Sequence, residues 1–251
     1  MSLVLRSARA LALATVAVSL STATLVAQAV PTVQQIHDRY VEAVGGRAAW
    51  ARHTSFTSKS TITLGAMGTA TSEGTLARPN LMLFKLVAPF GEILQGHDGT
   101  TVWSVNPMQG PQIVEGKAAD AIRQAGTWAL MTYEPGSYTS ATVVGPADFE
   151  GAKAWQVKMQ PIVGPEVTEY FDQATGLKLG AVAKSETPMG EIEARTVFRE
   201  YTAYGDLKMP RIVVQSNPMM GELVSTIESV EYDKAPPSAF ELPAAVKALK
   251  K

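Results

Sequence analysis

The stretch VQQIHDRYVEAVGGRAAW, residues 33–50, decides how this chain begins. Its apolar side chains recur at helical spacing, with charged residues off that face. These apolar residues are Val33, Ile36, Tyr40 and Val44. Thr32 and Gln35 stand three residues apart, the spacing of an N-terminal capping box. Gly45 supplies a left-handed stop, and residues 47–52 predict one more helical turn.

The preceding residues have the three parts of an export signal. Arg6 and Arg9 make its start positively charged, residues 10–26 are apolar or small, and residues 27–29 read A-Q-A, a cleavage signature. We expect cleavage before Val30 and a periplasmic location. The alternative is an uncleaved anchor, because the apolar run approaches the length that spans a bilayer.

The composition of the remaining chain excludes several classes of function. Residues 30–251 keep 20 basic and 23 acidic side chains, because the signal removes two arginines and no acid. Nucleic-acid binding needs a basic patch, so no nucleic-acid partner is expected. The chain has no cysteine, which rules out disulfides, thiol catalysis and the lipid-bearing cysteine of a lipoprotein. Its length suits a single domain, residues 30–251.

From residue 55 onward the hydrophobic pattern changes to the period of two that is typical of strands. Residues 81–87, LMLFKLV, are apolar almost throughout, which indicates a strand covered on both faces. Asp98-Gly99 is a hairpin turn, and further turn signals recur at roughly 10–15-residue spacing. Residues 115–131 interrupt the strands with a second helical pattern. The expected fold class is mainly β (α+β), an antiparallel sheet with an N-terminal and a mid-chain helix.

No constellation for catalysis or metal binding stands out among the three histidines. His37 lies on the apolar face of the first helix, where a packed side chain is expected, and His53 follows a helix. His97 has an acid beside it, but adjacent strand residues point to opposite faces. A zinc site needs three or four converging ligands, and no such spacing or serine-nucleophile motif occurs. We expect no enzyme activity, no cofactor and no metal.

The residues that do indicate a function are apolar. Methionine is flexible and suits surfaces that adapt to varied apolar ligands; core gap-filling or exposed turns are the alternatives. The methionines at predicted turns and rims are Met67, Met108, Met131, Met189, Met209, Met219 and Met220. Trp128 stands on the predicted mid-chain helix, which we expect to lie across the open sheet as a lid.

Several segments, taken in order, resemble those of one family. Residues 40–46 read YVEAVGG, residues 97–103 read HDGTTVW and residues 170–177 read YFDQATGL. Residues 201–210 and 230–240 add a turn and a closing strand that ends in phenylalanine. In order and spacing they resemble the motifs of periplasmic outer-membrane lipoprotein-sorting proteins, relatives of LolA and of the mycobacterial lipid carriers LppX and LprG.

The resemblance implies an incomplete, strongly curved antiparallel β-barrel covered by the N-terminal and mid-chain helices, whose concave face holds acyl chains. It implies no enzyme activity and no cofactor. We therefore expect a periplasmic carrier for an acylated or other hydrophobic ligand or a lipoprotein, with lipoprotein sorting to the outer membrane as the particular role. The alternative is a non-enzymatic periplasmic subunit or scaffold that binds a protein complex, including a membrane-associated protein. A hydrolase using His97 is the third reading.

Apolar residues of the central predicted strands are the expected lining of the ligand cavity. They are Leu81, Leu83, Phe84, Leu86, Ile93, Val102 and Trp103, with Trp128 on the covering helix. A register error of one residue would move every strand member of this set to the other face.

Overall fold

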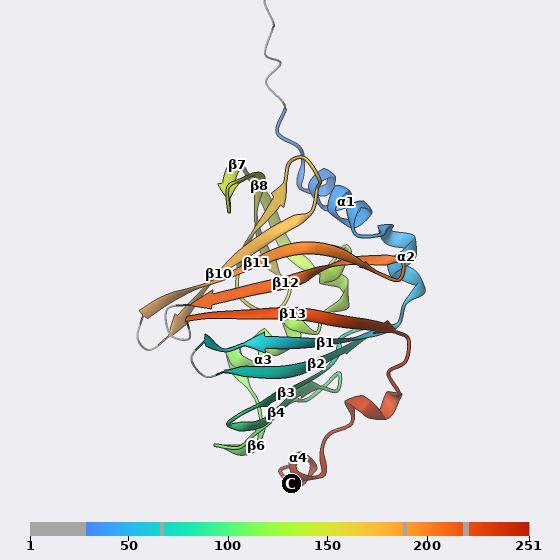
Figure 1. Cartoon of the computed structure of the whole chain (residues 1–251), viewed down its shortest axis with the longest axis vertical. Coiled ribbons are helices and arrows are strands. Elements are labelled where there is room, and N and C mark those ends of the chain that lie inside the picture. Colours follow the sequence, from blue (N-terminus) through green and yellow to red (C-terminus); the bar gives the residue numbers. More distant parts are fainter. Residues whose placement is uncertain (1–28, 66–67, 188–189, 218–220, 251) are drawn as a thin grey trace, which may run out of the picture.

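The strands of this chain form one continuous curved sheet. The computed structural model describes residues 29–65, 68–187, 190–217 and 221–250, so residues 1–28 of the predicted export signal lie outside the described ranges. The described residues form a 13-stranded antiparallel sheet in the order β6-β5-β4-β3-β2-β1-β13-β12-β11-β10-β9-β8-β7 (Figure 1). No helix within those ranges is long and apolar enough to cross a membrane.

Within each half of the chain, β1 to β6 and β7 to β13, successive strands pair with each other, and β1 pairs with β13, which joins the two halves. The strands of the first half are β1 (Ser55–Thr63), β2 (Thr69–Ala77), β3 (Leu81–Ala88), β4 (Gly91–His97), β5 (Val102–Asn106) and β6 (Gly110–Ile113). Those of the second half are β7 (Tyr138–Phe149), β8 (Ala152–Pro161), β9 (Val167–Asp172), β10 (Lys178–Thr187), β11 (Gly190–Tyr204), β12 (Leu207–Asn217) and β13 (Gly221–Tyr232).

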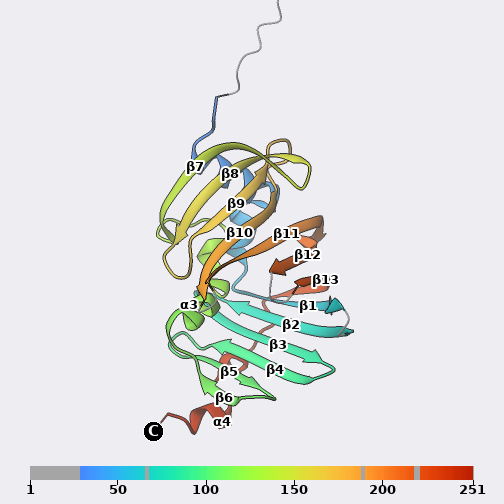
Figure 2. The ribbon, with the colours of Figure 1, turned by 90° about the vertical axis from the view of Figure 1, so that its left-hand side faces the viewer.

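The sheet curves but does not close. β6 and β7 are its two edges, and Figure 2 shows the strands curving from β7 at the top to β6 at the bottom, with a helix between the two halves. The fold is therefore mainly β, an open half-barrel with helices, as the sequence predicted.

The opening helices follow the predicted pattern. α1 (Val33–Ala43) begins at a capping box, in which the Thr32 side chain accepts from Gln35 N–H and the Gln35 side chain accepts from Thr32 N–H. Gly45, with φ +120°, separates α1 from α2 (Gly46–Arg52).

The predicted mid-chain helix is broken in two. α3 (Gly116–Ala125) ends at Gly126, and the 3₁₀ helix η2 (Trp128–Met131) follows. A side chain at Gly126 would place its Cβ 3.0 Å from Met82 Cβ, so the glycine lets the helix end approach β3 closely. The sequence predicted one helix over residues 115–131, because the apolar spacing continues across this break.

The strand register identifies the concave face. Phe56, Leu76, Met82, His97 and Val102 are directly paired across β1 to β5. Residues paired in this way share one face of an antiparallel sheet. Phe56 packs in a core cluster with residues of α2 and η2, so this row marks the face that the helices cover.

Two core clusters attach the helices to the concave face. In the first, Ile36 and Val41 of α1 pack with Val157 of β8 and Phe171 of β9. The second joins Val44, α2, η2 and β12, and includes Trp50, Phe56, Trp128, Leu207 and Met209. The helices thus close one side of the half-barrel and leave space between themselves and the strands.

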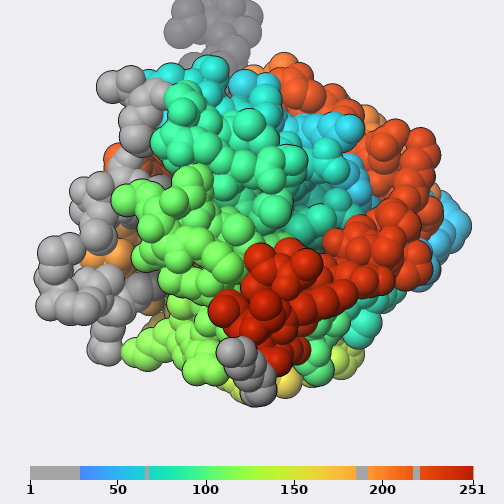
Figure 3. All heavy atoms as spheres, turned by 90° about the horizontal axis from the view of Figure 1, so that it is seen from below, coloured from blue at the N-terminus to red at the C-terminus, as the bar shows by residue number. Residues whose placement is uncertain are grey.

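The C-terminal segment covers the outer face of the first half. η3 (Pro237–Phe240) contacts β3, and α4 (Ala244–Lys247) contacts β6. Figure 3 shows this segment in red against the strands coloured cyan and green. Trp103 lies over Gly96, where an added Cβ would be 2.4 Å from its ring. The C-terminal segment therefore covers part of the outer face, next to β3 and β6.

Candidate ligand cavity

A cavity of about 400 Å³ lies between the concave face and the helices. This volume falls within the range of roughly 300–1,000 Å³ for small-molecule sites. From the helical segments and the link between α3 and η2, its lining is Tyr40, Trp50, Gln124, Ala125, Thr127, Leu130 and Met131. From the strands, it is Phe56, Ser58, Met159, Pro161, Val167, Glu169, Lys178, Phe198, Tyr201, Lys208, Met209, Pro210 and Ile227. The cavity is mostly apolar and contains two lysines and one acid.

A buried polar cluster forms part of this wall. Lys178 Nζ lies 2.9 Å from Glu169 Oε1 and donates to the Tyr133 hydroxyl at 3.1 Å. The Tyr133 hydroxyl donates to Glu169 Oε2 at 2.7 Å. The Lys178 and Glu169 side chains are only 17% and 7% exposed, so the ion pair sits in low-dielectric surroundings.

The aromatic neighbours of this ion pair favour its charged form. Lys178 Nζ stands 5.5 Å above the rings of Tyr40 and Tyr133 and 5.6 Å above Phe198, within the range of cation–π contacts.

Burial lowers the pKa of Lys178, but the charge of Glu169 and its hydrogen bond outweigh burial and raise the pKa overall. Burial and the charge of Glu169 raise the pKa of Tyr133 well above its ordinary value. Tyr133 is therefore a neutral donor beside a charged pair.

His37 packs directly behind the cluster. It is fully buried, its ring stacks on Tyr133 with the centroids 3.8 Å apart, and neither ring nitrogen has a hydrogen-bond partner in the part of the chain that the structure describes. Burial lowers the pKa of His37 to about 4, so the ring is neutral near pH 7. The histidine is packed, as the sequence indicated.

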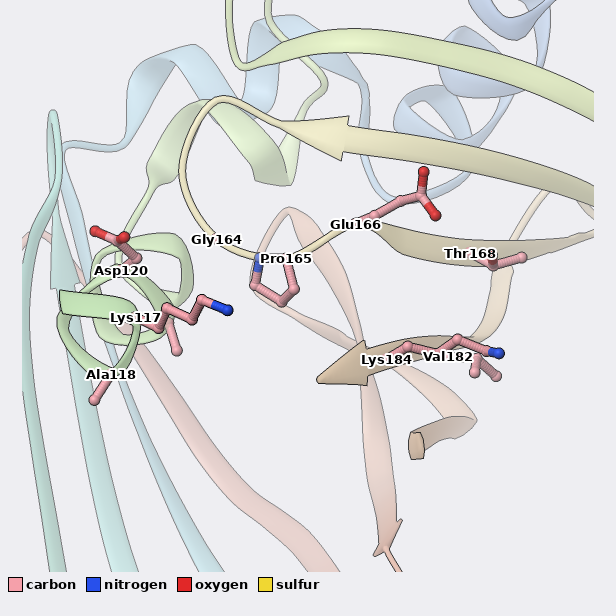
Figure 4. A pocket seen from close by; sticks show the side chains of 10 residues that line it. Lys117, Ala118, Asp120, Gly164, Pro165, Glu166, Thr168, Val182 and Lys184 are labelled. Atoms are coloured by element: carbon pink, nitrogen blue, oxygen red, sulfur yellow. The ribbon is translucent and has the colours of Figure 1, made fainter. Parts of the chain in front are cut away.

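A second hollow of about 740 Å³ borders α3 on the side of the loop 162–166. In Figure 4, Lys117 points from α3 toward Pro165, while the Glu166 side chain points away from the helix. Gln124 packs on Gly164, where an added Cβ would be 2.3 Å from its Oε1. Several charged residues line this hollow, so the smaller cavity is the better candidate for an apolar ligand.

Four of the predicted lining residues lie on the concave face but not at the cavity. By register, Phe84, Leu86, Ile93 and Val102 share the face of Phe56. The cavity is lined by β1 and β8 to β13 instead, toward the other half of the sheet. Ligand contact by these four residues stays a prediction.

We expected Leu81, Leu83 and Trp103 to line the cavity. The strand register instead places their side chains on the outer face of the sheet. For Leu81 and Leu83 the cause is the apolar run of β3, because a pattern that is apolar on both faces does not reveal which face is inside. Trp128 is buried beneath the lining, with its ring 5.9 Å from that of Trp50 and 5.6 Å from that of Phe56.

The polar residues of the cavity were absent from the predicted set. One signal could have found Glu169: Val167, Glu169 and Phe171 alternate on one face of β9, and an acid at such an apolar position is unusual. Lys178 follows a turn in the sequence, and only the pairing of β9 with β10 brings it to Glu169.

The predicted methionine sites divide into three groups. Met131 and Met209 line the cavity, together with Met159. Met108 is 95% exposed at a turn. The others, Met67, Met189, Met219 and Met220, lie outside the described residues.

The remaining histidines have separate partners. His97 Nδ1 bonds to the carbonyl of Asn80, whereas Asp98 accepts from the Thr100 and Thr101 backbone in its own turn. In the part of the chain that the structure describes, no three His, Asp or Glu residues converge as metal ligands would.

Solved structures share this architecture. A LolA superfamily protein from Nitrosomonas europaea has a TM-score of 0.58 at 12% identity, over 85% of this chain and 99% of its own. A DUF1329 family protein from Desulfovibrio piger has a TM-score of 0.57 at 13% identity, over 85% and 98%. An outer membrane lipoprotein-sorting protein domain from Vibrio parahaemolyticus has a TM-score of 0.51 at 12% identity, over 80% and 92%.

No protein-family model matches the sequence, and no curated protein sequence matches it. At identities of 12–13% the structural likeness establishes the fold alone. The chain has a LolA-like fold.

Proposed function

We propose that this protein is a non-enzymatic periplasmic carrier that holds an acylated or other hydrophobic ligand in the cavity between its sheet and its helices. Lipoprotein sorting to the outer membrane is the particular role that we propose to test first. The observation that carries the proposal is the mostly apolar cavity of about 400 Å³ on the concave face. The predicted export signal at residues 1–29 supports the periplasmic location.

The lining suits an extended apolar chain. Met131, Met159 and Met209 present flexible thioether side chains that adapt to ligands of different shape. Burial contributes about 0.8 kcal/mol per CH₂, so a chain of about 12 carbons would contribute on the order of 9 kcal/mol before ordering costs. This magnitude is sufficient for a carrier that must also release its ligand.

The proposal is tested by ligand retention and uptake. Protein purified from the periplasm should release lipid that mass spectrometry detects, and delipidated protein should bind a fluorescent fatty acid. Ser58→Phe, which places a ring in the cavity, should weaken uptake at least about tenfold. Lys59→Phe adds the same ring to an exposed position one residue along β1 and should leave uptake unchanged. Absence of both retained lipid and uptake in the wild type would sink the carrier proposal.

A protein-binding scaffold is the second candidate, favoured by exposed apolar residues at turns. Phe90 is 50% exposed and Met108 is 95% exposed. Their turns lie side by side, because a Cβ at Gly91 would be 2.5 Å from Pro107 Cγ. Periplasmic cross-linking through these turns separates the candidates: a scaffold would lose its partner in Phe90→Ser/Met108→Ser, whereas a carrier would keep its lipid.

A further inference from the structure

We infer that Lys178 and Glu169 are the polar end of the cavity, and that they select a neutral hydrogen-bond acceptor, such as an ester or amide carbonyl on an acyl chain, over a free carboxylate. The inference rests on the proposed carrier function. It adds a chemical class for the ligand's head, which neither the apolar lining nor the fold specifies.

The pair is placed where the head of a bound chain would lie. Both residues line the cavity together with Tyr40 and Phe198, and the rest of the lining is largely apolar. Lys178 Nζ stands between the Tyr40 and Phe198 rings, at 5.5 and 5.6 Å. A chain held along the apolar lining would therefore meet one concentrated polar region.

The ammonium group of Lys178 can donate a hydrogen bond to a ligand. An ammonium group carries three N–H donors, and among the described residues its nitrogen has two hydrogen-bond acceptors, Glu169 Oε1 and the Tyr133 hydroxyl. The side chain is 17% exposed although its surroundings are buried. One N–H is thus available to a carbonyl oxygen of the ligand.

The charge balance decides which acceptor is preferred. Glu169 compensates Lys178, so the pair is neutral as a unit. A ligand carboxylate would add a second negative charge beside Glu169 and leave one charge unbalanced in a low-dielectric wall, an arrangement that proteins avoid. An ester or amide carbonyl accepts the same hydrogen bond without that penalty.

The other lysine of the cavity does not change this balance. Lys208 also lines the space, but it is exposed, where water weakens its attraction for an anion. A lysine outside the cavity provides the control: Lys153, at the start of β8, is 76% exposed and pairs with Asp148.

The experiment measures affinities of delipidated protein for methyl dodecanoate, dodecanoate and dodecane at pH 8, by calorimetry or by displacement of a fluorescent probe. We expect the wild type to bind the methyl ester at least about tenfold more tightly than the carboxylate. Glu169→Gln leaves Lys178 without a counter-charge, so it should shift the ratio toward the carboxylate by at least about tenfold. Lys153→Met should leave the ratio unchanged.

The double variant Lys178→Met/Glu169→Gln keeps the experiment decisive if Glu169→Gln does not fold. It removes both charges, so its preference for methyl dodecanoate over dodecane should be smaller than that of the wild type. Equal binding of ester and carboxylate by the wild type, or the same change of this ratio in Lys153→Met as in Glu169→Gln, would overturn the inference and leave the carrier function standing. Failure of the wild type to bind all three probes would overturn the carrier function itself.

Discussion

The His37 ring stacks on the Tyr133 ring with the centroids 3.8 Å apart and the planes 14° from parallel. The Tyr133 hydroxyl donates to Glu169, and the two nitrogens of the buried His37 imidazole have no hydrogen-bond partner among the described residues. A neutral buried histidine beside a charged pair makes stability depend on pH.

Acid should weaken the fold through His37. Burial lowers the pKa of His37 from 6.5 to about 4. Between these two pH values the unfolded chain therefore binds a proton at His37 and the folded chain does not. The free energy of unfolding is therefore unaffected by His37 above pH 6.5 and decreases by about 3 kcal/mol as the pH falls toward 4. Urea denaturation at pH 7 and pH 4 should show that His37→Phe loses less stability than the wild type. Identical losses in the two proteins would contradict this assignment.

The opposite dependence is expected at His53. Its Nδ1 lies 2.7 Å from Asp233 and its Nε2 2.9 Å from Asp206. Partial burial lowers the pKa of His53, but the hydrogen bonds to these two acids outweigh it and raise the pKa overall. The stabilisation of the fold by protonated His53 is complete below the pKa of His53 in the unfolded chain. It is lost as the pH rises through the pKa of His53 in the folded protein.

The measurement for His53 compares the wild type with His53→Gln by urea denaturation at pH 5.5 and pH 8.5. The destabilisation caused by the substitution should be larger at pH 5.5. Because both proteins retain His37, its effect cancels in the difference. A larger gap at the alkaline pH would show that His53 is neutral in the folded protein.

The buried pair of Lys178 and Glu169 should be strongly coupled. Removing one partner leaves a charge without compensation, so Lys178→Met or Glu169→Gln should each lower the free energy of unfolding by about 3–5 kcal/mol. The double variant should cost less than the sum, because it removes both charges. A double-mutant cycle from denaturation curves measures the coupling, and additive effects would mean that the pair is not coupled in the folded state.

Gly45 should tolerate no side chain. Its φ is +120°, and an added Cβ would be 2.7 Å from the carbonyl oxygen of Asp206. Strain and overpacking together predict that Gly45→Ala lowers the free energy of unfolding by about 2–4 kcal/mol. Gly151 also has positive φ, +81°, but open space around it, so Gly151→Ala should cost about 1 kcal/mol or less. Equal effects at the two glycines would show that φ alone decides the cost.

Local patterns predicted the elements of this fold well. The capping residues Thr32 and Gln35 and the stop at Gly45 lie where the first helix begins and ends. Period-two alternation and turn dipeptides predicted the strands, since both depend on residues close together in the chain. The mid-chain helix was predicted but not its break at Gly126, where the backbone comes close to Met82 of β3.

The sequence by itself determined that this protein is a helix-capped antiparallel sheet, because periodicity and turn chemistry are local properties. Only the tertiary structure decided where the cavity lies and what it contains. The half-barrel brings Lys178 to Glu169, nine residues apart, and Tyr133, 36 residues from Glu169, to the same carboxylate. Such contacts depend on strand register and on the face that the helices cover, and neither follows from a pattern that is apolar on both faces.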